Sequence, residues 1–288
     1  MSGERLAVSG KETKSLRGLW ISASVRTLLC IVVLLLTAYR SPLTAVQIQD
    51  NSFLLEEAYN QESGIVQHIS TFARPSGGNA WAYSFTQEWP LTGIRHQLSY
   101  TLPVQNDDGG TGLGDVALNY RYQLLGHPDA AMVLAPRLSL LLPTGNDEQG
   151  RGAGAPGFQA NLPLSVVLAP RVVTHLNAGA TITPSAQSPL GDEATTTNFN
   201  LGASAIWLLR PSFNLMVEAL WLSEASVAGS GETVRDEFLL LNPGFRAAFD
   251  LGSLQIVPGV AYTFDLSPDS DDDALFVYLS FEHPFKRQ

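Results

Sequence analysis

From about residue 64 to Phe285, the chain alternates apolar and polar residues, and this period of two is the feature that most constrains its fold. The segment 115–124 shows the two faces: one carries Val116, Leu118, Tyr120, Tyr122 and Leu124, the other Asp115, Ala117, Asn119, Arg121 and Gln123. Side chains alternate across a strand, whereas the faces of a helix repeat every 3.6 residues. The pattern therefore predicts strands.

Counting these segments predicts about twelve strands, near 64–73, 79–89, 94–103, 113–125, 131–143, 157–168, 172–183, 197–209, 213–222, 237–249, 254–265 and 274–285. Most reach about ten residues, the length that crosses a bilayer obliquely. Strands of soluble proteins average nearer five or six residues. Four prolines fall inside predicted strands and argue against an uninterrupted ladder there; they are Pro136, Pro163, Pro243 and Pro258.

The connections between these segments alternate between short and long. The short ones are 90–93, 126–129, 169–171, 210–212 and 250–253; the long, Gly- and acid-rich ones are 104–111, 144–155, 184–196, 223–235 and 266–273. Tight turns on one side and long loops on the other are typical of outer-membrane barrels. The predicted fold is all-β, a transmembrane antiparallel up-and-down barrel. With Phe285 ending the last strand in the periplasm, the short turns face the periplasm and the long loops face outward.

The first 45 residues have the pattern of a signal peptide. Basic residues precede an apolar core, Thr27–Ala38, which is too short to favour a transmembrane helix. The predicted organisation is therefore a signal peptide at 1–45, a periplasmic lead-in or interior plug at 46–63, and the barrel at 64–288. An uncleaved anchor is the alternative for the first segment.

The net charge excludes one class of partner. Of 17 basic and 27 acidic residues, six and two lie in residues 1–45, so the remainder has 11 and 25 and a net charge of −14. Phosphate contacts need clustered Lys and Arg, so we expect no nucleic acid partner. The lone cysteine, Cys30, lies in the apolar core of the signal segment, so the mature chain has no disulfide framework.

Charged residues on the polar faces mark the expected barrel interior, because charges that face lipid are costly. The candidate lumen-lining residues are Glu88, Arg95, Asp115, Arg121, Arg137, His175, Glu218, Arg246 and Glu282. They fit either a polar path that sets solute selectivity or an ion-paired filling of the lumen. Twelve strands do not decide between these, since about eight leave a filled barrel and sixteen a channel.

No residues predict catalysis, a cofactor or a metal site. A hydrolase would need a serine activated by an oriented histidine, and Ser99 lies on the opposite face from His96. The acidic run 269–273 lacks the glycine and distal glutamate of a calcium-binding EF-hand loop. It fits a solvated outer surface better.

Three stretches resemble the outer-membrane family known as the MetA pathway of phenol degradation. They are Glu56–Glu62 with Gly64–His68, Gly112–Val116 with Tyr120–Tyr122, and Pro136–Leu138 with Leu142–Gly145. The resemblance implies a barrel in the outer membrane of a Gram-negative bacterium that takes up small aromatic or other hydrophobic compounds. It carries no binding site over to named residues.

The sequence thus predicts a passive, cofactor-free outer-membrane channel or transporter for a small solute. A closed structural or interaction barrel is the first alternative, and an outer-membrane lipid hydrolase is the second. The expected partners are membrane lipids and lipopolysaccharide, the solute, and the barrel-assembly machinery. The last of these would read the C-terminal strand, where alternating apolar residues finish at Phe285.

Overall fold

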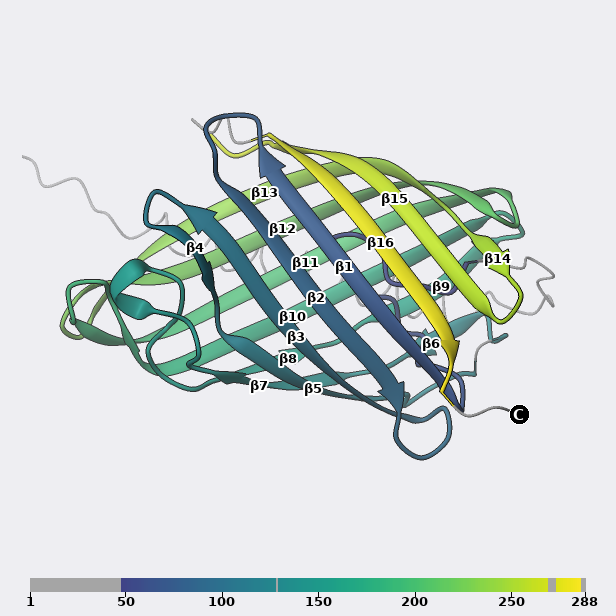
Figure 1. The fold of residues 1–288 in the computed structure, drawn as a ribbon, viewed down its shortest axis with the longest axis horizontal. Helices are drawn as coiled ribbons and strands as arrows, with labels where there is room; N and C mark the ends of the chain where they lie inside the picture. Colours follow the sequence, from purple (N-terminus) through teal and green to yellow (C-terminus); the bar gives the residue numbers. More distant parts are fainter. Residues whose placement is uncertain (1–47, 128, 269–272, 286–288) are drawn as a thin grey trace, which may run out of the picture. The chain divides into compact units, whose positions relative to one another are not determined.

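The computed structural model describes residues 48–127, 129–268 and 273–285; the predicted signal peptide lies outside them. The described chain forms a closed antiparallel barrel of 12 strands (Figure 1). Its strands are β1 (Ile65–Pro75), β2 (Trp81–Pro90), β3 (His96–Asp107), β4 (Gly110–Leu113), β5 (Val116–Tyr122), β6 (Met132–Leu134), β7 (Arg137–Leu142), β8 (Gly157–Asn161), β9 (Leu164–Ala169), β10 (Val172–Gln187), β11 (Glu193–Arg210), β12 (Phe213–Gly229), β13 (Glu232–Ala247), β14 (Phe249–Leu251), β15 (Leu254–Asp265) and β16 (Ala274–Pro284).

Sixteen strand pieces make twelve strands because four strands are interrupted, giving the pairs β4/β5, β6/β7, β8/β9 and β13/β14. Pro136 separates β6 from β7, and Pro163 separates β8 from β9. The two breaks lie side by side, since the Ala135 N–H donates to the Pro163 carbonyl (3.1 Å). Pro243 and Pro258 lie within β13 and β15, and the ladder between these two strands omits both. A proline cannot donate to a ladder, so these gaps follow from the sequence.

The barrel closes where β1 pairs with β16, from Ile65 opposite Pro284 to Pro75 opposite Ala274. The ladder between β10 and β11 completes the circuit. Beyond β16, the Phe285 N–H donates to the Gly64 carbonyl (2.9 Å). The two chain ends of the barrel therefore lie at the same end as the short turns.

Three of the predicted long loops are wrong. In 104–111, β3 and β4 pair out to Asp107 opposite Gly110, so this connection is a tight hairpin. Strands β10 to β13 are 16 to 18 residues long and continue through most of 184–196 and 223–235. The pairing of β12 with β13 runs out to Gly229 and Glu232, around a tight turn in which Gly231 has φ +78°. Glycine adopts this left-handed conformation without a steric penalty. The alternation continues beyond the length that a bilayer requires, so these hairpins project past it.

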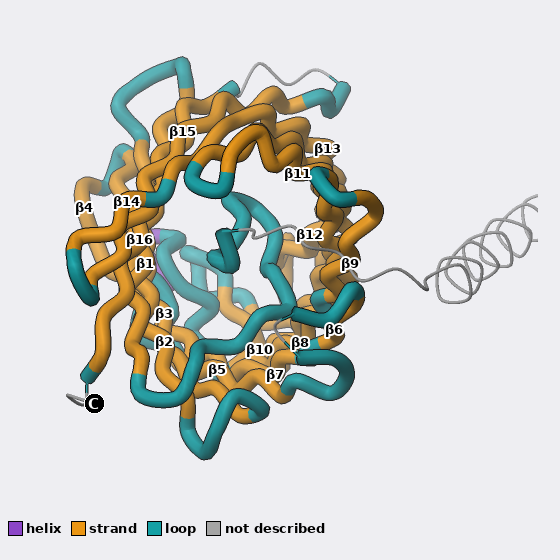
Figure 2. The backbone as a smooth tube through the Cα atoms, turned by 90° about the vertical axis from the view of Figure 1, so that its right-hand side faces the viewer, coloured by secondary structure: helices purple, strands orange, loops and turns teal. Residues whose placement is uncertain are grey.

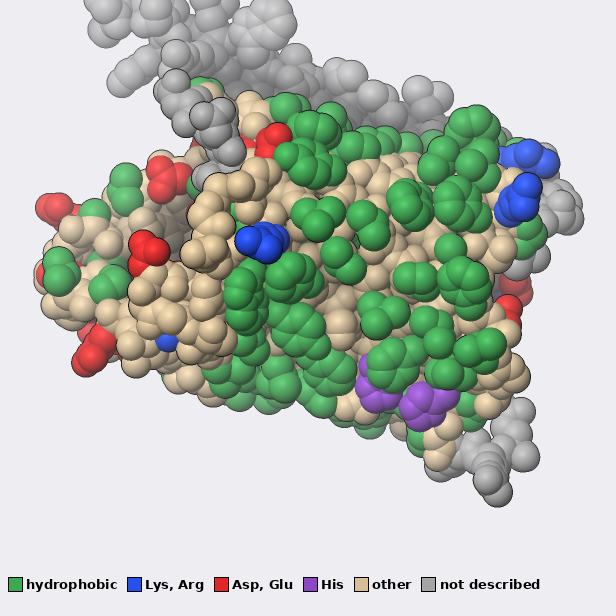
Figure 3. Space-filling view, turned by 45° about the horizontal axis from the view of Figure 1, so that its top comes forward, with side chains coloured by type: hydrophobic (Ala, Val, Ile, Leu, Met, Phe, Trp, Pro, Cys, Tyr) green, Lys and Arg blue, Asp and Glu red, His purple; other side chains and the backbone are tan. Residues whose placement is uncertain are grey.

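The outer surface carries a broad apolar zone. Large apolar side chains are exposed around the barrel, for example Leu138 (62%) and Trp207 (52%). In Figure 3 hydrophobic side chains cover the middle of the visible face, and acidic side chains gather toward one end. No helix in the described part of the chain is long and apolar enough to span a membrane. The exposed apolar surface is instead that of the strands.

Candidate functional site

The N-terminal segment, residues 48–61, runs through the interior of the barrel (Figure 2). It has no regular secondary structure, and most of its side chains are buried. Buried backbone N–H and C=O groups need hydrogen-bond partners. Polar side chains on the inner wall supply them, so the polar faces of the strands hold this segment in place.

Glu218, at the middle of β12, receives three successive backbone amides. Its carboxylate accepts hydrogen bonds from Phe53, Leu54 and Leu55 at 3.0–3.1 Å. Asn242, on the neighbouring strand β13, donates to the same carboxylate at 2.8 Å. Hydrogen bonds to a charged group contribute about 1.5–3 kcal/mol each. Glu218 is therefore a strong anchor for the centre of the segment.

Arg246, on β13, binds the beginning of the segment. Its guanidinium donates to the carbonyls of Ile48 (2.9 Å), Asp50 (3.2 Å) and Asn51 (3.0 Å). It also forms an ion pair with Glu57 at 2.9 Å. Both side chains are buried, so the ion pair compensates two charges that would otherwise be costly there.

Asp50 connects the segment to the strands that close the barrel. Its carboxylate accepts hydrogen bonds from Tyr278 (2.6 Å) and Ser280, both on β16, and from Gln67 on β1. Gln67 is paired with Glu282 across the β1–β16 ladder. One buried carboxylate thus bridges the first and last strands from inside.

Glu56 is surrounded by positive charge. Arg137 donates to both Glu56 carboxylate oxygens at 2.8 Å, and the Arg121 guanidinium lies 3.5 Å from one of them. Burial raises the pKa of Glu56, but the two guanidinium groups outweigh it, and the pKa falls to about 2. Arg121 also pairs with Glu88 at 3.5 Å. Arg121 and Arg137 are therefore each paired with at least one carboxylate.

Ser165, His175 and Glu57 form a serine–histidine–carboxylate array. The Ser165 hydroxyl lies 2.7 Å from His175 Nδ1, and His175 Nε2 lies 3.5 Å from Glu57. All three residues are at most 2% exposed, and the Ser165 Oγ accepts the Ala58 N–H at 2.8 Å. The hydroxyl is thus buried and is used to hold the N-terminal segment.

Two glycines of the inner wall make room for the segment. A Cβ on Gly259 would lie 2.5 Å from the Phe53 ring, and one on Gly202 would lie 2.3 Å from the Leu55 side chain. Real Cβ atoms do not approach other heavy atoms so closely. Small residues at these inward positions therefore allow the side chains of the segment to reach the wall.

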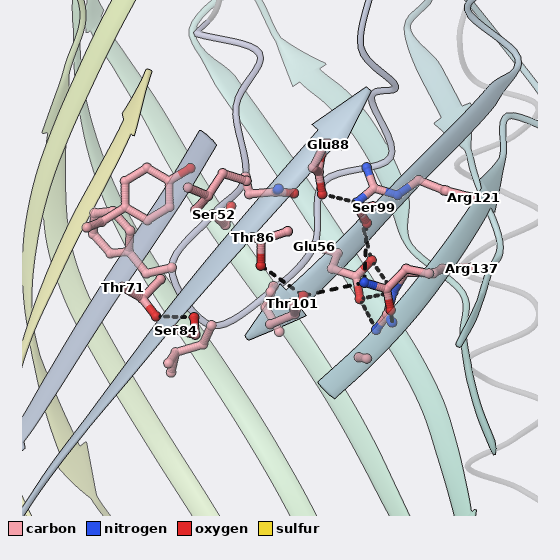
Figure 4. A pocket seen from close by; sticks show the side chains of 18 of the residues that line it. Ser52, Glu56, Thr71, Ser84, Thr86, Glu88, Ser99, Thr101, Arg121 and Arg137 are labelled. Carbon is pink, nitrogen blue, oxygen red and sulfur yellow. Dashed lines mark hydrogen bonds and ion pairs between the residues drawn. The ribbon is translucent and has the colours of Figure 1, made fainter. Parts of the chain in front are cut away.

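A cavity of about 290 Å³ lies between the N-terminal segment and one side of the barrel (Figure 4). The segment contributes residues 51–56, including Phe53 and Leu54. The wall contributes Ile69, Thr71, Ser84, Thr86, Glu88, Ser99, Thr101, Ala117, Asn119, Arg121, Arg137, Gln159 and Tyr278. A volume near 300 Å³ is at the small end of ligand pockets, so the cavity fits one ring-sized molecule.

The outer loops are tied together at the end of the barrel with the long connections. The Asp115 carboxylate accepts the N–H groups of Gly145 and Ala153 (2.9 and 2.8 Å). Arg151 donates to Asp107 through Nε and Nη2 (3.1 and 2.8 Å). The loop 143–156 is thereby fixed at both of its arms, and the sequence motifs 112–116 and 142–145 meet at Asp115.

The structure brings six of the nine predicted residues together around the N-terminal segment: Glu88, Arg121, Arg137, His175, Glu218 and Arg246. Glu282 is half-buried on β16 beside Gln67. The prediction for Arg95 is wrong, because β3 begins at His96 and Arg95 lies exposed in the preceding turn. The prediction for Asp115 is also wrong, because this residue lies between β4 and β5 and binds the loop backbone.

Sequence reasoning missed the uncharged anchors. Asn177 accepts the Glu56 N–H and donates to its carbonyl (3.1 and 2.8 Å), and Gln97 accepts the Gln61 N–H (2.7 Å). Their position on polar strand faces was the available signal. Asp50 gave no signal, because the segment that contains it has no regular period.

Comparison with known proteins supports the same architecture. The family model "Putative MetA-pathway of phenol degradation" matches residues 45–270. No protein of curated function matches the chain. An outer membrane channel from Pseudomonas putida F1 is similar with a TM-score of 0.56 and 12% identity, over 79% of this chain and 98% of that chain.

A second similar structure is the KdgM porin, with a TM-score of 0.48 and 8% identity, over 76% of this chain and 99% of that chain. At these identities, the likeness to the Pseudomonas channel shows the fold, and the weaker likeness to the porin carries no further argument. Together with the apolar outer surface, the fold is that of a barrel of the bacterial outer membrane.

Proposed function

This chain belongs to the MetA-pathway of phenol degradation family, and from that premise we propose that it is a passive outer-membrane channel for a small aromatic or other hydrophobic solute. The observation that carries the proposal is the cavity of about 290 Å³ inside the barrel, bordered by Phe53 and Leu54. A ring-sized space with apolar side chains suits a small hydrophobic molecule.

In this proposal the N-terminal segment, within the predicted plug 46–63, controls passage. It is held by hydrogen bonds and ion pairs rather than by strand pairing. A set of side-chain contacts can be released locally without opening the barrel wall. Solute would pass when part of the segment moves aside.

The proposal includes no catalysis. His96 Nδ1 lies 2.7 Å from the Tyr120 hydroxyl on the outer face, so its position does not support the hydrolase alternative. Ser165 and His175 are buried against the segment. In the closed-barrel alternative the segment would stay in place permanently and the outer loops would meet other partners.

The proposed partners are those of a membrane channel. The apolar outer zone would contact lipids, and the acidic outer end would face lipopolysaccharide and its bridging cations. The C-terminal strand β16, ending next to Phe285, would be read by the barrel-assembly machinery. We propose neither a nucleic acid partner nor a cofactor.

Single-channel recording of the refolded mature barrel in planar bilayers tests the proposal. We expect small, stable conductance steps, and a reduction of the current when a monoaromatic solute is added. Arg121→Gln and Arg137→Gln should change the ion selectivity if the cluster borders the path. A barrel that is correctly folded yet electrically silent and impermeable in liposome-swelling assays would support the closed-barrel alternative.

A further inference from the structure

The carboxylate of Glu56 occupies a site whose donors belong to the barrel wall. Arg137 Nε, on β7, lies 2.8 Å from each carboxylate oxygen, and Asn161, on β8, donates to one of them at 2.8 Å. Arg121 Nη2, on β5, completes the set at 3.5 Å (Figure 4). Glu56 itself lies in the N-terminal segment, which has no regular secondary structure. The wall thus forms a carboxylate site, and the segment supplies the carboxylate.

The two closest donors are oriented by the wall and not by the segment. Arg137 Nη1 donates to Asn119 on β5 at 2.9 Å, and Arg137 Nη2 donates to Gln159 on β8 at 2.8 Å. Asn161 also donates to Asn177 on β10 at 2.9 Å. Side chains that are held by such supporting contacts on rigid strands keep their geometry when a ligand leaves. The site therefore persists without Glu56.

The charges of the site require one anion. Arg121 has a second carboxylate partner, Glu88 on β2, at 3.5 Å. Among the described residues, Glu56 is the only one that forms an ion pair with Arg137. If Glu56 left, the Arg137 charge would stay largely buried and unpaired, which is costly. A monoanion would compensate this charge, and a neutral molecule would not.

The site is reached from the cavity. Glu56, Arg121 and Arg137 all line the cavity, and the side chains of Glu56 and Arg137 are 21% and 14% exposed. A solute in the cavity can therefore reach the Arg137 guanidinium beside Glu56. The planar fork of an arginine matches the two oxygens of a carboxylate, so the geometry favours a carboxylate over a spherical anion.

We propose that Arg137, Arg121 and Asn161 form a binding site for a small monocarboxylate, and that Glu56 is the internal ligand that this molecule displaces. Binding would free the Glu56 side of the segment, while Glu218 and Arg246 still hold the rest. The site goes beyond the proposed function, and only its effect on passage rests on that function. A tethered ligand competes at an effective concentration of about millimolar, so we expect wild-type binding in the millimolar range.

Binding of fluoroacetate and fluoroacetamide tests the site, since the two probes have similar shapes and differ in charge. Both are titrated at pH 7 by ¹⁹F NMR against the mature barrel in lipid nanodiscs, in a buffer free of other carboxylates. Empty nanodiscs measure association with lipid. We expect saturable binding of fluoroacetate alone. Equal binding of the two probes would overturn the proposal.

The variant Glu56→Ala removes the internal ligand and leaves the wall unchanged. It should bind fluoroacetate at least about tenfold more tightly than the wild type, because a site that is free about one-tenth of the time loses a factor of about ten in affinity. Glu193→Ala, at the exposed start of β11, is the matched control and should leave the affinity unchanged. Equal affinity of Glu56→Ala and the wild type would overturn the proposal.

The double variant Glu56→Ala/Arg137→Lys assigns the binding to the wall. Lysine keeps the charge but lacks the planar fork, so the double variant should lose about tenfold relative to Glu56→Ala. Arg210→Lys in the same background, at the exposed end of β11, is the control and should lose nothing. Heat-modifiable gel mobility verifies folding, and Glu56→Gln replaces Glu56→Ala if the latter misfolds. Undiminished binding in the double variant would place the anion elsewhere and refute the site.

The binding measurement is independent of passage. Conductance by a barrel that binds no fluoroacetate, in the wild type or in Glu56→Ala, would leave the channel function intact and refute the carboxylate site. Binding with the expected preferences by an electrically silent barrel would support the site and refute passage.

Discussion

Both carboxylate oxygens of Glu218 accept the backbone N–H of Leu54, at 3.0 and 3.1 Å. Glu218 lies in the middle of a membrane-spanning strand, and Leu54 lies in a segment without regular structure. The contact shows how this barrel is filled: inner-wall side chains take the hydrogen-bonding role that a neighbouring strand has elsewhere.

Replacing Glu218 by Gln should loosen the segment. An amide has one acceptor oxygen, and its NH₂ group would face the amides of residues 53–55. We therefore expect the segment to be held inside the barrel about 1–3 kcal/mol less strongly. Single-channel conductance should rise at least about twofold. Glu224→Gln, at an exposed position of the same strand, should leave the conductance unchanged. Equal currents in the wild type, Glu218→Gln and Glu224→Gln would contradict the anchoring role of Glu218.

Acid should release the segment at Glu56. Because its folded pKa of about 2 lies below the ordinary 4.5, the stabilisation is fully present above pH 4.5 and is lost as the pH falls through about 2. Conductance recorded from pH 7 to pH 2.5 should therefore stay constant down to about pH 4.5 and increase below it. Glu56→Gln should show the higher conductance already at pH 7, and a variant as closed as the wild type would argue against this ion pair.

Gly259→Ala should push Phe53 away from the wall, because the new Cβ would lie 2.5 Å from its ring. Overpacking of this kind costs about 1–3 kcal/mol. Combining it with Phe53→Leu should restore seating, since the shorter side chain leaves room for the methyl group. Proteolysis of the N-terminal segment measures this; if the double variant is cut as fast as Gly259→Ala alone, the clash is not the cause.

Arg151→Met should free the outer loop 143–156. Arg151 is 7% exposed and makes two hydrogen bonds to Asp107, so its loss removes the contact that joins this loop to the β3–β4 hairpin. We expect proteinase K to cut the loop about tenfold faster in intact proteoliposomes. Arg171→Met, in an exposed short turn, is the control, and equal rates in the Arg151→Met variant and the wild type would contradict this role of Arg151.

Ser165 should not react with a fluorophosphonate probe in the folded barrel, despite its 2.7 Å contact with His175. The residue is 1% exposed and its oxygen accepts the Ala58 N–H. Mass spectrometry of the treated protein checks this. Labelling at Ser165, together with lipid hydrolysis that Ser165→Ala abolishes, would revive the hydrolase alternative.

The alternation of residues was sufficient to predict the barrel. Side chains point to opposite faces of a strand in turn, so the inward position of Glu218 and the outward position of Leu138 could be read locally. The same rule failed at Arg95, where it could not tell the first residue of a strand from the last of a turn. It also failed at 223–235, where charged residues suggested a loop although the ladder continues.

What the sequence determined by itself was therefore the strands, their inner and outer faces and the number that closes the barrel, because these are properties of neighbouring residues. The tertiary structure decided which inner residues meet. Glu218 and Phe53 are 165 positions apart, and the segment that contains Phe53 has no period from which its path could be read. Only closure of the barrel around that segment brings the polar faces to its backbone and leaves the hydroxyl-lined cavity beside it.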